Sequence, residues 1–298
     1  MSLKYEKWRD LIIDPFSIKF KTIKIKKIIN YLPAGNDVVE CIGQRNEIPT
    51  RFFIKIERSK MADFKSEINN LNILFKNKYY LKIPEIYEYG QVNDKNYIVL
   101  SPISGKRLSE LLEAKTNQKF KKQLLQKYGN ELGLIHKIPS KNFNIAKQRI
   151  INEIPSQKHY SNFGFNSTKI INYLKENHPK ITFDTFIHGD FHYGNVLWQN
   201  RQIIGVVDFE YSGLGFKEQD IAWACILRPN QKFMNNIIDI KEFLKGYLNN
   251  GTFNSKSLKW CLINGYLHFY LMNESNKEYR QELLNMIDTI IEYDFNNL

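Results

Sequence analysis

Hydrophobic and polar positions in the first hundred residues follow patterns that are mostly typical of strands. Lysine and isoleucine alternate over most of residues 22–29, which predicts a half-buried strand. The turn residues LPAGND follow, and then the segments VVECIG and RFFIKIE flank the turn QRNEIP. Two short apolar runs around such a turn predict a hairpin.

Residues 61–75 change to helical spacing. Phe64, Ile68, Leu71 and Phe75 fall on one stripe, as on the buried face of a surface helix. The following segment, IPEIYEYGQVNDKNYIVLSPISG, predicts two more strands around a turn at residues 93–94. The predicted order is strand, strand, strand, helix, strand, strand.

Helical patterns dominate the chain after Gly105. The helical stretches are residues 108–138, 167–177, 236–248 and 255–273, and a last one follows residue 278. A compact non-helical island occupies residues 185–215. We therefore expect two lobes, residues 1–102 and residues 103–298.

The non-helical island carries the candidate chemistry. His188, Asp190 and Asn195 stand in the pattern HxDxxxxN within a polar loop. A short hairpin follows, made of VLW, the turn QNRQ and IIGVV, and Asp208 comes directly after its second strand. Each of these polar residues alone is typical of a turn or a strand end. Their combination in this order favours a catalytic loop followed by a metal-binding aspartate.

This pattern suits phosphoryl transfer, which needs positioning and neutralisation of negative charge more than covalent chemistry. Asp190 is the candidate catalytic residue, because a carboxylate must orient or deprotonate the acceptor hydroxyl. Asn195 and Asp208 are the candidate metal ligands, since Mg²⁺ prefers carboxylate and amide oxygens. The hairpin brings these two candidates together although they are thirteen positions apart.

The segment HGDFHYGN…DFEYSG resembles the aminoglycoside phosphotransferase and choline kinase superfamily. Gly189 replaces the arginine of the protein-kinase H-R-D motif, and Glu210 stands where D-F-G has its glycine. The resemblance implies an α+β, protein-kinase-like fold, with a small antiparallel-sheet lobe that binds nucleotide and a larger helical lobe that binds the acceptor. It also implies Mg²⁺ and ATP or GTP as the co-substrate.

The resemblance extends to the first lobe. It implies that Lys55, in the strand RFFIKIE, contacts the nucleotide phosphates and that Glu67 on the next helix pairs with it. Gly35 in LPAGND would place backbone amides on a phosphate, although a plain turn explains the same residues. The segment YIVLSPISG resembles the hinge, so Ser101 and Ile103 would present backbone groups to the base.

The acceptor stays open between several small hydroxylated molecules. The residues after DFEYSG resemble choline and ethanolamine kinases, whose cationic substrate needs aromatic faces. Aromatic candidates are Tyr211, Trp223, Trp260, Tyr266 and Tyr270, of which the last three share one predicted helix and are typical of a core. The GND turn resembles antibiotic phosphotransferases, whose polycationic acceptor needs carboxylates. These candidates are Glu210, Glu218, Asp220, Glu274, Glu278 and Glu282.

A thiamine-kinase-like activity and a non-catalytic nucleotide-binding pseudokinase are the further alternatives. The complete set of Lys55, Glu67, Asp190, Asn195 and Asp208 argues against the pseudokinase. His136 and His188 are interpreted as structural residues.

Composition narrows the remaining classes. Hydrophobic residues make up 43% and charged residues 25% of the 298 positions, which is typical of a globular protein. No apolar run reaches the ~18 residues of a membrane span, and the polar start argues against a signal peptide. We therefore expect a cytoplasmic protein without a membrane partner. The net charge of +12 raises nucleic-acid binding as an alternative, but the lysines are spread along the chain. The three cysteines lie far apart, which predicts reduced thiols.

Overall fold

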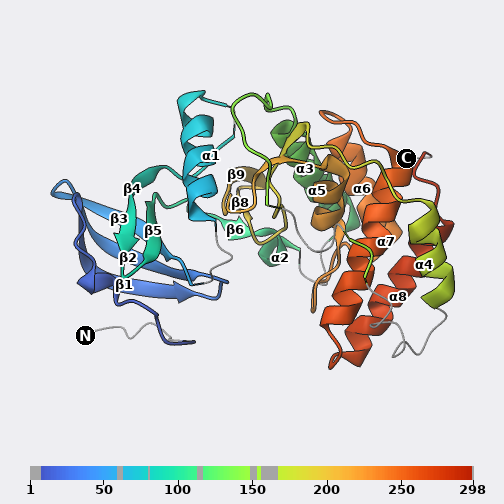
Figure 1. Cartoon of the computed structure of the whole chain (residues 1–298), viewed down its shortest axis with the longest axis horizontal. Helices are drawn as coiled ribbons and strands as arrows, with labels where there is room; N and C mark the ends of the chain where they lie inside the picture. Colours follow the sequence, from blue (N-terminus) through green and yellow to red (C-terminus); the bar gives the residue numbers. More distant parts are fainter. Residues whose placement is uncertain are drawn as a thin grey trace. The chain divides into compact units, whose positions relative to one another are not determined.

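The computed structural model describes residues 8–58, 63–79, 81–112, 117–147, 153–155 and 167–296. The chain divides into two compact units (Figure 1). The first is Met1–Ser104 together with Gly205–Glu210, and the second is Gly105–Ile204 together with Tyr211–Leu298. The short return segment brings Asp208 and Glu210 into the first unit.

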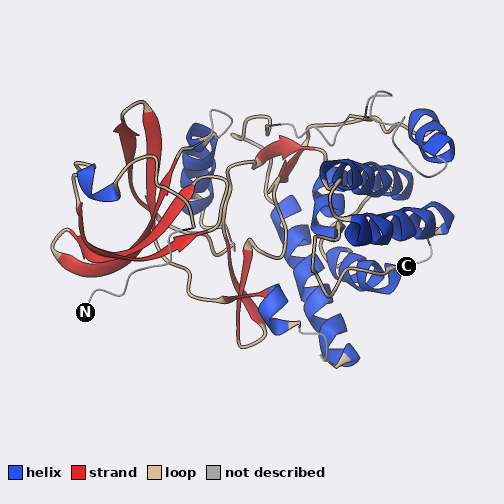
Figure 2. Ribbon diagram, turned by 90° about the horizontal axis from the view of Figure 1, so that it is seen from below, coloured by secondary structure: helices blue, strands red, loops and turns tan. Residues whose placement is uncertain are grey.

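The first unit contains a five-stranded antiparallel sheet in the order β1-β2-β3-β5-β4 (Figure 2). Its strands are β1 (Ile23–Leu32), β2 (Asp37–Arg45), β3 (Ile48–Ile56), β4 (Ile86–Val92) and β5 (Lys95–Leu100). A 3₁₀ turn (Pro15–Ser17) precedes the sheet, and helix α1 (Phe64–Lys76) lies between β3 and β4 in the chain. The predicted order of strands and helix is confirmed.

Two tight hairpin turns in this sheet have left-handed backbone at both central residues. Asn46 and Glu47 join β2 to β3 with φ of 49° and 67°, and Asn93 and Asp94 join β4 to β5 with φ of 45° and 57°. Positive φ at both central residues is the geometry whose twist matches that of the flanking strands. The sheet packs a core around side chains such as Val39 that have no exposed surface.

The second unit is mainly helical. Its helices are α2 (Leu108–Leu111), α3 (Gln118–His136), α4 (Ser167–Glu176), α5 (Lys217–Cys225), α6 (Ile237–Tyr247), α7 (Ser255–Met272) and α8 (Lys277–Glu292). Short strands occur in the predicted non-helical island and just before α2. They are β6 (Lys106–Arg107), β7 (Thr185–Ile187), β8 (Val196–Gln199), β9 (Gln202–Val206) and β10 (Gly213–Gly215); the last two residues of β9 belong to the first unit.

Glycines allow α3 and α6 to approach closely. A Cβ on Gly129 would lie 1.9 Å from the Phe243 carbonyl oxygen, and one on Gly246 would lie 1.9 Å from that of Gln126. Since any larger side chain would collide with backbone at both positions, this contact fixes the long helix that ends at His136.

Two helical assignments differ from the sequence pattern. The periodic stretch 108–138 holds two helices, because α2 ends at Leu111 and α3 begins after Asn117, whose side chain accepts from the Lys119 amide. Helix α5 lacks a sequence signal, because its buried residues include Glu218, Gln219 and Asp220, so that polar and apolar positions do not separate into two faces. Positions 61–62 of the predicted first helix lie outside the described residues.

Candidate functional site

Lys55 of the first unit is surrounded by carboxylates. Its Nζ lies 2.7 Å from Glu67 Oε2, 2.7 Å from Asp208 Oδ1 and 3.1 Å from Glu210 Oε2. The Lys55 side chain is only 6% exposed, because β3 is buried on both sides at this point. The structure thus brings together three residues that the sequence singled out, Lys55, Glu67 and Asp208, and adds Glu210.

Local structure explains how these side chains meet. The Asp63 side chain caps the start of α1, and Glu67 lies in the first turn, on the buried face of the helix. The hairpin β8–β9 turns at Asn200 and Arg201, with φ of 49° and 62°, as its polar turn QNRQ predicts. Asp208 itself has a left-handed φ of 68°, which is uncommon for a residue with a Cβ.

Burial and charge act against each other in this cluster. Burial by itself would lower the pKa of Lys55, but Asp208, Glu67 and Glu210 outweigh it and hold that pKa well above its usual value. Burial raises the pKa of Glu67 to about 7 in spite of the neighbouring lysine. The cluster therefore holds one charged lysine among three carboxyl groups, and the lysine cannot neutralise all of them.

The same carboxylates fit a divalent cation. Glu67, Asp208 and Glu210 each offer an oxygen atom, and these atoms all lie within 4.8 Å of one another. Such hard oxygen donors are what Mg²⁺ prefers. Sequence reasoning named Asp208 as a metal ligand but listed Glu210 only among candidates for the acceptor site.

Asp190 and Asn195 belong to the second unit, where the structure places them in contact. The Asn195 Nδ2 atom donates to the Asp190 carbonyl oxygen at 3.0 Å and to its Oδ2 at 3.2 Å. The indole Nε1 of Trp223 donates to Asp190 Oδ1 at 2.8 Å, and His192 Nε2 lies 3.9 Å from Oδ2. Sequence reasoning considered Trp223 only as an aromatic face, because nothing local indicates that an indole on α5 reaches this loop.

The loop that carries Asp190 is tied down by Asp220 of α5. The buried Asp220 carboxylate accepts from the amides of His188 at 2.8 Å and Gly189 at 3.0 Å, and it lies 3.1 Å from His136 Nε2. Burial would raise the pKa of Asp220, but these contacts outweigh it and lower that pKa. His188 Nδ1 also accepts from the Asp190 amide at 3.2 Å. Both histidines thus make structural contacts, His188 within the loop and His136 through Asp220.

Gly189 has a physical reason to be glycine. Its φ is 74°, and a Cβ there would lie 2.0 Å from the Tyr211 carbonyl oxygen. A side chain such as the arginine of H-R-D does not fit this backbone.

The remaining predicted nucleotide-site residues lie in the first unit. Gly35 is in the loop between β1 and β2, and its carbonyl oxygen accepts from Arg9 at 3.2 Å. The Ser101 amide donates to the Glu85 carbonyl oxygen at 2.8 Å, and its hydroxyl accepts from the Glu85 amide. Ile103 packs closely on Gly205, since a Cβ at position 205 would lie 2.7 Å from the Ile103 side chain.

Most aromatic candidates for an acceptor site contact other groups of the protein. Trp260 and Tyr266 are buried in α7, where Trp260 donates to the Leu174 carbonyl oxygen and Tyr266 to that of Cys225. The Arg228 guanidinium lies 4.9 Å from the Trp223 ring centroid. Glu218 is also buried, and it accepts from the Asn254 amide.

Comparison with known proteins gives a family and a fold. The model of a family described as the phosphotransferase enzyme family (APH) matches residues 33–252. No curated protein sequence gives a significant match. Among the described residues, no helix has the length and apolar character needed to cross a membrane.

Solved structures of three enzymes illustrate the similarity. Aminoglycoside phosphotransferase APH(4)-Ia, solved with ADP and hygromycin B, is 14% identical, with a TM-score of 0.62 over 90% of this chain and 94% of that one. An aminoglycoside-3'-phosphotransferase of type VIII is 14% identical, with a TM-score of 0.57 over 83% and 94%. Choline kinase LicA from Streptococcus pneumoniae is 14% identical, with a TM-score of 0.54 over 85% and 90%. The two-lobed, protein-kinase-like α+β fold predicted from the sequence is thus confirmed.

Proposed function

This chain belongs to the phosphotransferase enzyme family, and we propose that it transfers the γ-phosphate of ATP or GTP to a hydroxyl group of a small molecule in the presence of Mg²⁺. The carrying observation is the Lys55 cluster, in which one buried lysine contacts Glu67 and Asp208 at 2.7 Å each. A lysine held in this way is suited to bind nucleotide phosphates, because its position and charge are fixed before the nucleotide arrives.

The proposed metal ligands are Asp208, Glu210 and Asn195. The donor set of the first unit fits Mg²⁺, since its carboxylate oxygens converge within 4.8 Å. When bound, the metal supplies positive charge that offsets the charge of the transferring phosphoryl group. Lys55, held in position by Glu67, then orients the phosphates and offsets part of their charge from the protein side.

Asp190 is the proposed catalytic residue. Its Oδ1 is held by the Trp223 indole at 2.8 Å, whereas the contact of Oδ2 with Asn195 is longer, at 3.2 Å. We assign Oδ2 to the acceptor hydroxyl, whose proton it orients or accepts as the phosphoryl group arrives. Trp223 and Asn195 keep the carboxylate in one orientation, which limits the loss of rotational freedom at the reacting group.

The base of the nucleotide is proposed to contact the segment around Ser101. Because the Ser101 amide already donates to Glu85, Ser101 contributes its carbonyl oxygen and Ile103 its amide. Because backbone groups alone do not distinguish ATP from GTP, both nucleotides are tested as phosphoryl donors. The expected cytoplasmic location also stays a prediction.

An aminoglycoside-like antibiotic is the first candidate acceptor. It is favoured over choline because Arg228 already occupies a face of the Trp223 ring at 4.9 Å, where a choline-type cation would compete with it. Three exposed carboxylates of the second unit are proposed to attract a polycation, and they are Glu274, Glu278 and Glu282. Choline, ethanolamine and thiamine form the second group of acceptors.

A coupled assay of ADP or GDP release tests the proposal. It crosses ATP and GTP with aminoglycosides, macrolides, choline, ethanolamine and thiamine, and uses Asp190→Asn as the blank. We expect release stimulated by one acceptor class in the wild type and abolished in the variant, with nucleotide binding retained. Wild-type turnover in Asp190→Asn would remove the assignment of the base.

A second variant separates the metal site from the base. Asp208→Ala is expected to remove the Mg²⁺ dependence of nucleotide affinity, and an unchanged dependence would refute its role as a ligand. Mg²⁺-dependent nucleotide binding without transfer to any acceptor would favour the non-catalytic pseudokinase.

A further inference from the structure

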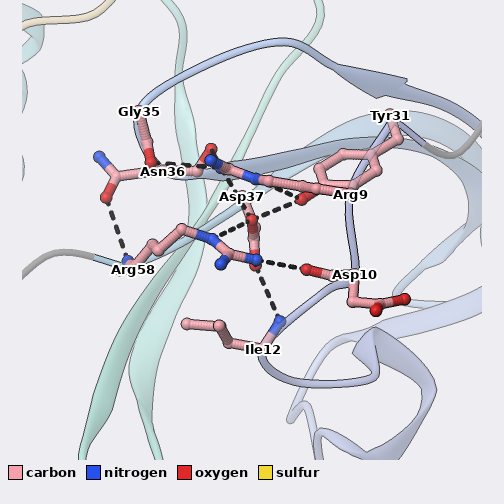
Figure 3. A network of polar contacts seen from close by, with 8 residues as sticks. All are labelled: Arg9, Asp10, Ile12, Tyr31, Gly35, Asn36, Asp37 and Arg58. Atoms are coloured by element: carbon pink, nitrogen blue, oxygen red, sulfur yellow. Dashed lines mark hydrogen bonds and ion pairs between the residues drawn. The ribbon is translucent and has the colours of Figure 1, made fainter.

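A buried carboxylate organises the loop between β1 and β2. Asp37, the first residue of β2, has no exposed surface, and it accepts from the Tyr31 hydroxyl at 2.5 Å and the Ile12 amide at 3.0 Å. Arg58 donates to both carboxylate oxygens, and Arg9 lies 2.9 Å from Oδ1 (Figure 3). Burial alone would raise the pKa of Asp37, but these contacts outweigh it, and the pKa falls below its usual value.

Arg9 contacts the loop tip as well as Asp37. Its guanidinium donates to the carbonyl oxygen of Gly35 at 3.2 Å and to that of Asn36 at 2.8 Å (Figure 3). Arg9 Nε also donates to the Tyr31 hydroxyl at 3.0 Å. One terminal nitrogen, Arg9 Nη2, therefore contacts two consecutive loop carbonyls and the buried Asp37 carboxylate, while Nε holds the guanidinium plane against Tyr31.

This arrangement decides where the loop amides point. In a trans peptide, the carbonyl of one residue and the amide of the next point in opposite directions. Because the carbonyls of Gly35 and Asn36 converge on Arg9, the amides of Asn36 and Asp37 are directed to the other side of the loop. Successive amides presented on one side form a concavity that binds anions.

The same loop is hydrogen-bonded to the Lys55 cluster. Asn36 Nδ2 donates to Glu210 Oε2 at 2.7 Å, and Asn36 Oδ1 accepts from the Arg58 amide at 3.2 Å. Glu210 in turn lies 3.1 Å from Lys55 Nζ. A hydrogen bond and an ion pair therefore connect the loop, through Glu210, to the proposed phosphate-binding lysine within the first unit.

We propose that Arg9 is a positioning residue for the nucleotide phosphates, because it orients the peptide planes of Gly35 and Asn36 so that the amides that follow bind a phosphate oxygen. This inference rests on the proposed phosphotransferase function. Arg9 lies before the residues 33–252 matched by the family model, so family membership does not assign it this role.

Isothermal titration calorimetry on the full chain tests the inference, with Mg·ADP and with adenosine as separate ligands. The variants are Arg9→Met, Arg9→Lys and Tyr31→Phe. Tyr31→Phe is the matched control, because it also removes hydrogen bonds from Asp37 and Arg9 but leaves the Arg9 contacts with the loop carbonyls. Thermal unfolding of each variant accompanies the titrations.

We expect Arg9→Met to weaken Mg·ADP binding about tenfold, the loss of one hydrogen bond to a charged group, and to leave adenosine binding unchanged. Arg9→Lys is expected to behave like Arg9→Met, since the lysine Nζ ends one bond short of the position of the Nη2 atom that contacts the loop carbonyls. Tyr31→Phe is expected to lower the unfolding temperature without changing either affinity. If Arg9→Met does not fold, the comparison of Arg9→Lys with Tyr31→Phe carries the test.

Three results would overturn the inference while the proposed function stands. They are an unchanged Mg·ADP affinity in Arg9→Met, an equal loss for adenosine and Mg·ADP, and full retention in Arg9→Lys alone. The second indicates a merely structural role, and the third a long-range charge effect. A wild type that binds Mg·ADP no better than adenosine would overturn the proposed function together with the inference.

Discussion

Replacing Asp220 with asparagine is expected to destabilise the second unit by about 3–5 kcal/mol. The buried carboxylate accepts from the amides of His188 and Gly189 at 2.8 and 3.0 Å and contacts His136 Nε2 at 3.1 Å. Asparagine has the same shape, but one of its terminal atoms is itself a donor. At least one N–H group then loses its acceptor, and the remaining bonds lose their charge assistance. A lost charge-assisted bond costs about 1.5–3 kcal/mol and a buried unpaired donor about 1–3 kcal/mol.

Urea unfolding measures this loss. Intrinsic fluorescence reports mainly the second unit, because three of the four tryptophans, Trp198, Trp223 and Trp260, lie within it and only Trp8 lies in the first. Because the pKa of Asp220 is lowered by folding, its contribution is present at neutral pH and is lost as the pH falls through the folded-state pKa. The wild type therefore loses more stability in acid than the variant does.

Glu218→Gln is the matched control on the same helix. Glu218 is also buried, but a single backbone amide, that of Asn254, donates to it at 2.9 Å, so a loss of about 1 kcal/mol is expected. The reasoning is refuted if Asp220→Asn costs no more than Glu218→Gln. Asp220→Asn should also lower phosphoryl transfer at temperatures where it is fully folded, since the amides of His188 and Gly189 precede the proposed catalytic Asp190.

Three further predictions concern single side chains. Trp223→Phe removes the donor to Asp190 Oδ1 and is expected to lower kcat about tenfold to a hundredfold at constant nucleotide KM; steady-state kinetics with an unchanged kcat would contradict this. Burial raises the pKa of Glu131 to about 7, so wild-type stability falls as the pH rises from the ordinary glutamate pKa through 7. Melts of Glu131→Gln from pH 4 to 8 should show a smaller fall, since only the contribution of Glu67 remains, and an identical slope would disprove the assignment. Lys55→Met leaves three clustered carboxylates without their lysine and should cost about 3–5 kcal/mol. Added Mg²⁺ should raise its unfolding temperature more than that of the wild type, and an equal rise would count against the carboxylate metal site.

Local sequence patterns predicted most of the secondary structure. The strands of the first unit, the helix with Glu67 on its buried face and the hairpin before Asp208 all follow from hydrophobic spacing and turn residues within one segment. Helix α5 was missed because seven of its nine residues are buried, three of them polar, and no apolar stripe marks a helical period.

Partners distant in sequence had no such local signal. Sequence motifs identified Asp190 and Asp208. The indole that contacts Asp190 belongs to Trp223, and the guanidinium that contacts the loop at Gly35 belongs to Arg9. The roles of these residues in catalysis stay predictions, whereas their contacts are properties of the fold.

The sequence by itself thus determined the order of the elements, the presence of the HxDxxxxN loop and the kinase-like character of the chain. Only the tertiary structure decided that Glu210 joins the carboxylates around Lys55, that Trp223 binds Asp190 and that Arg9 reaches the loop between β1 and β2. The physical reason is that periodicity and turn chemistry act over a few residues. Charge pairing and hydrogen bonding of buried groups depend instead on which distant segments the packed core brings within about 3 Å of one another.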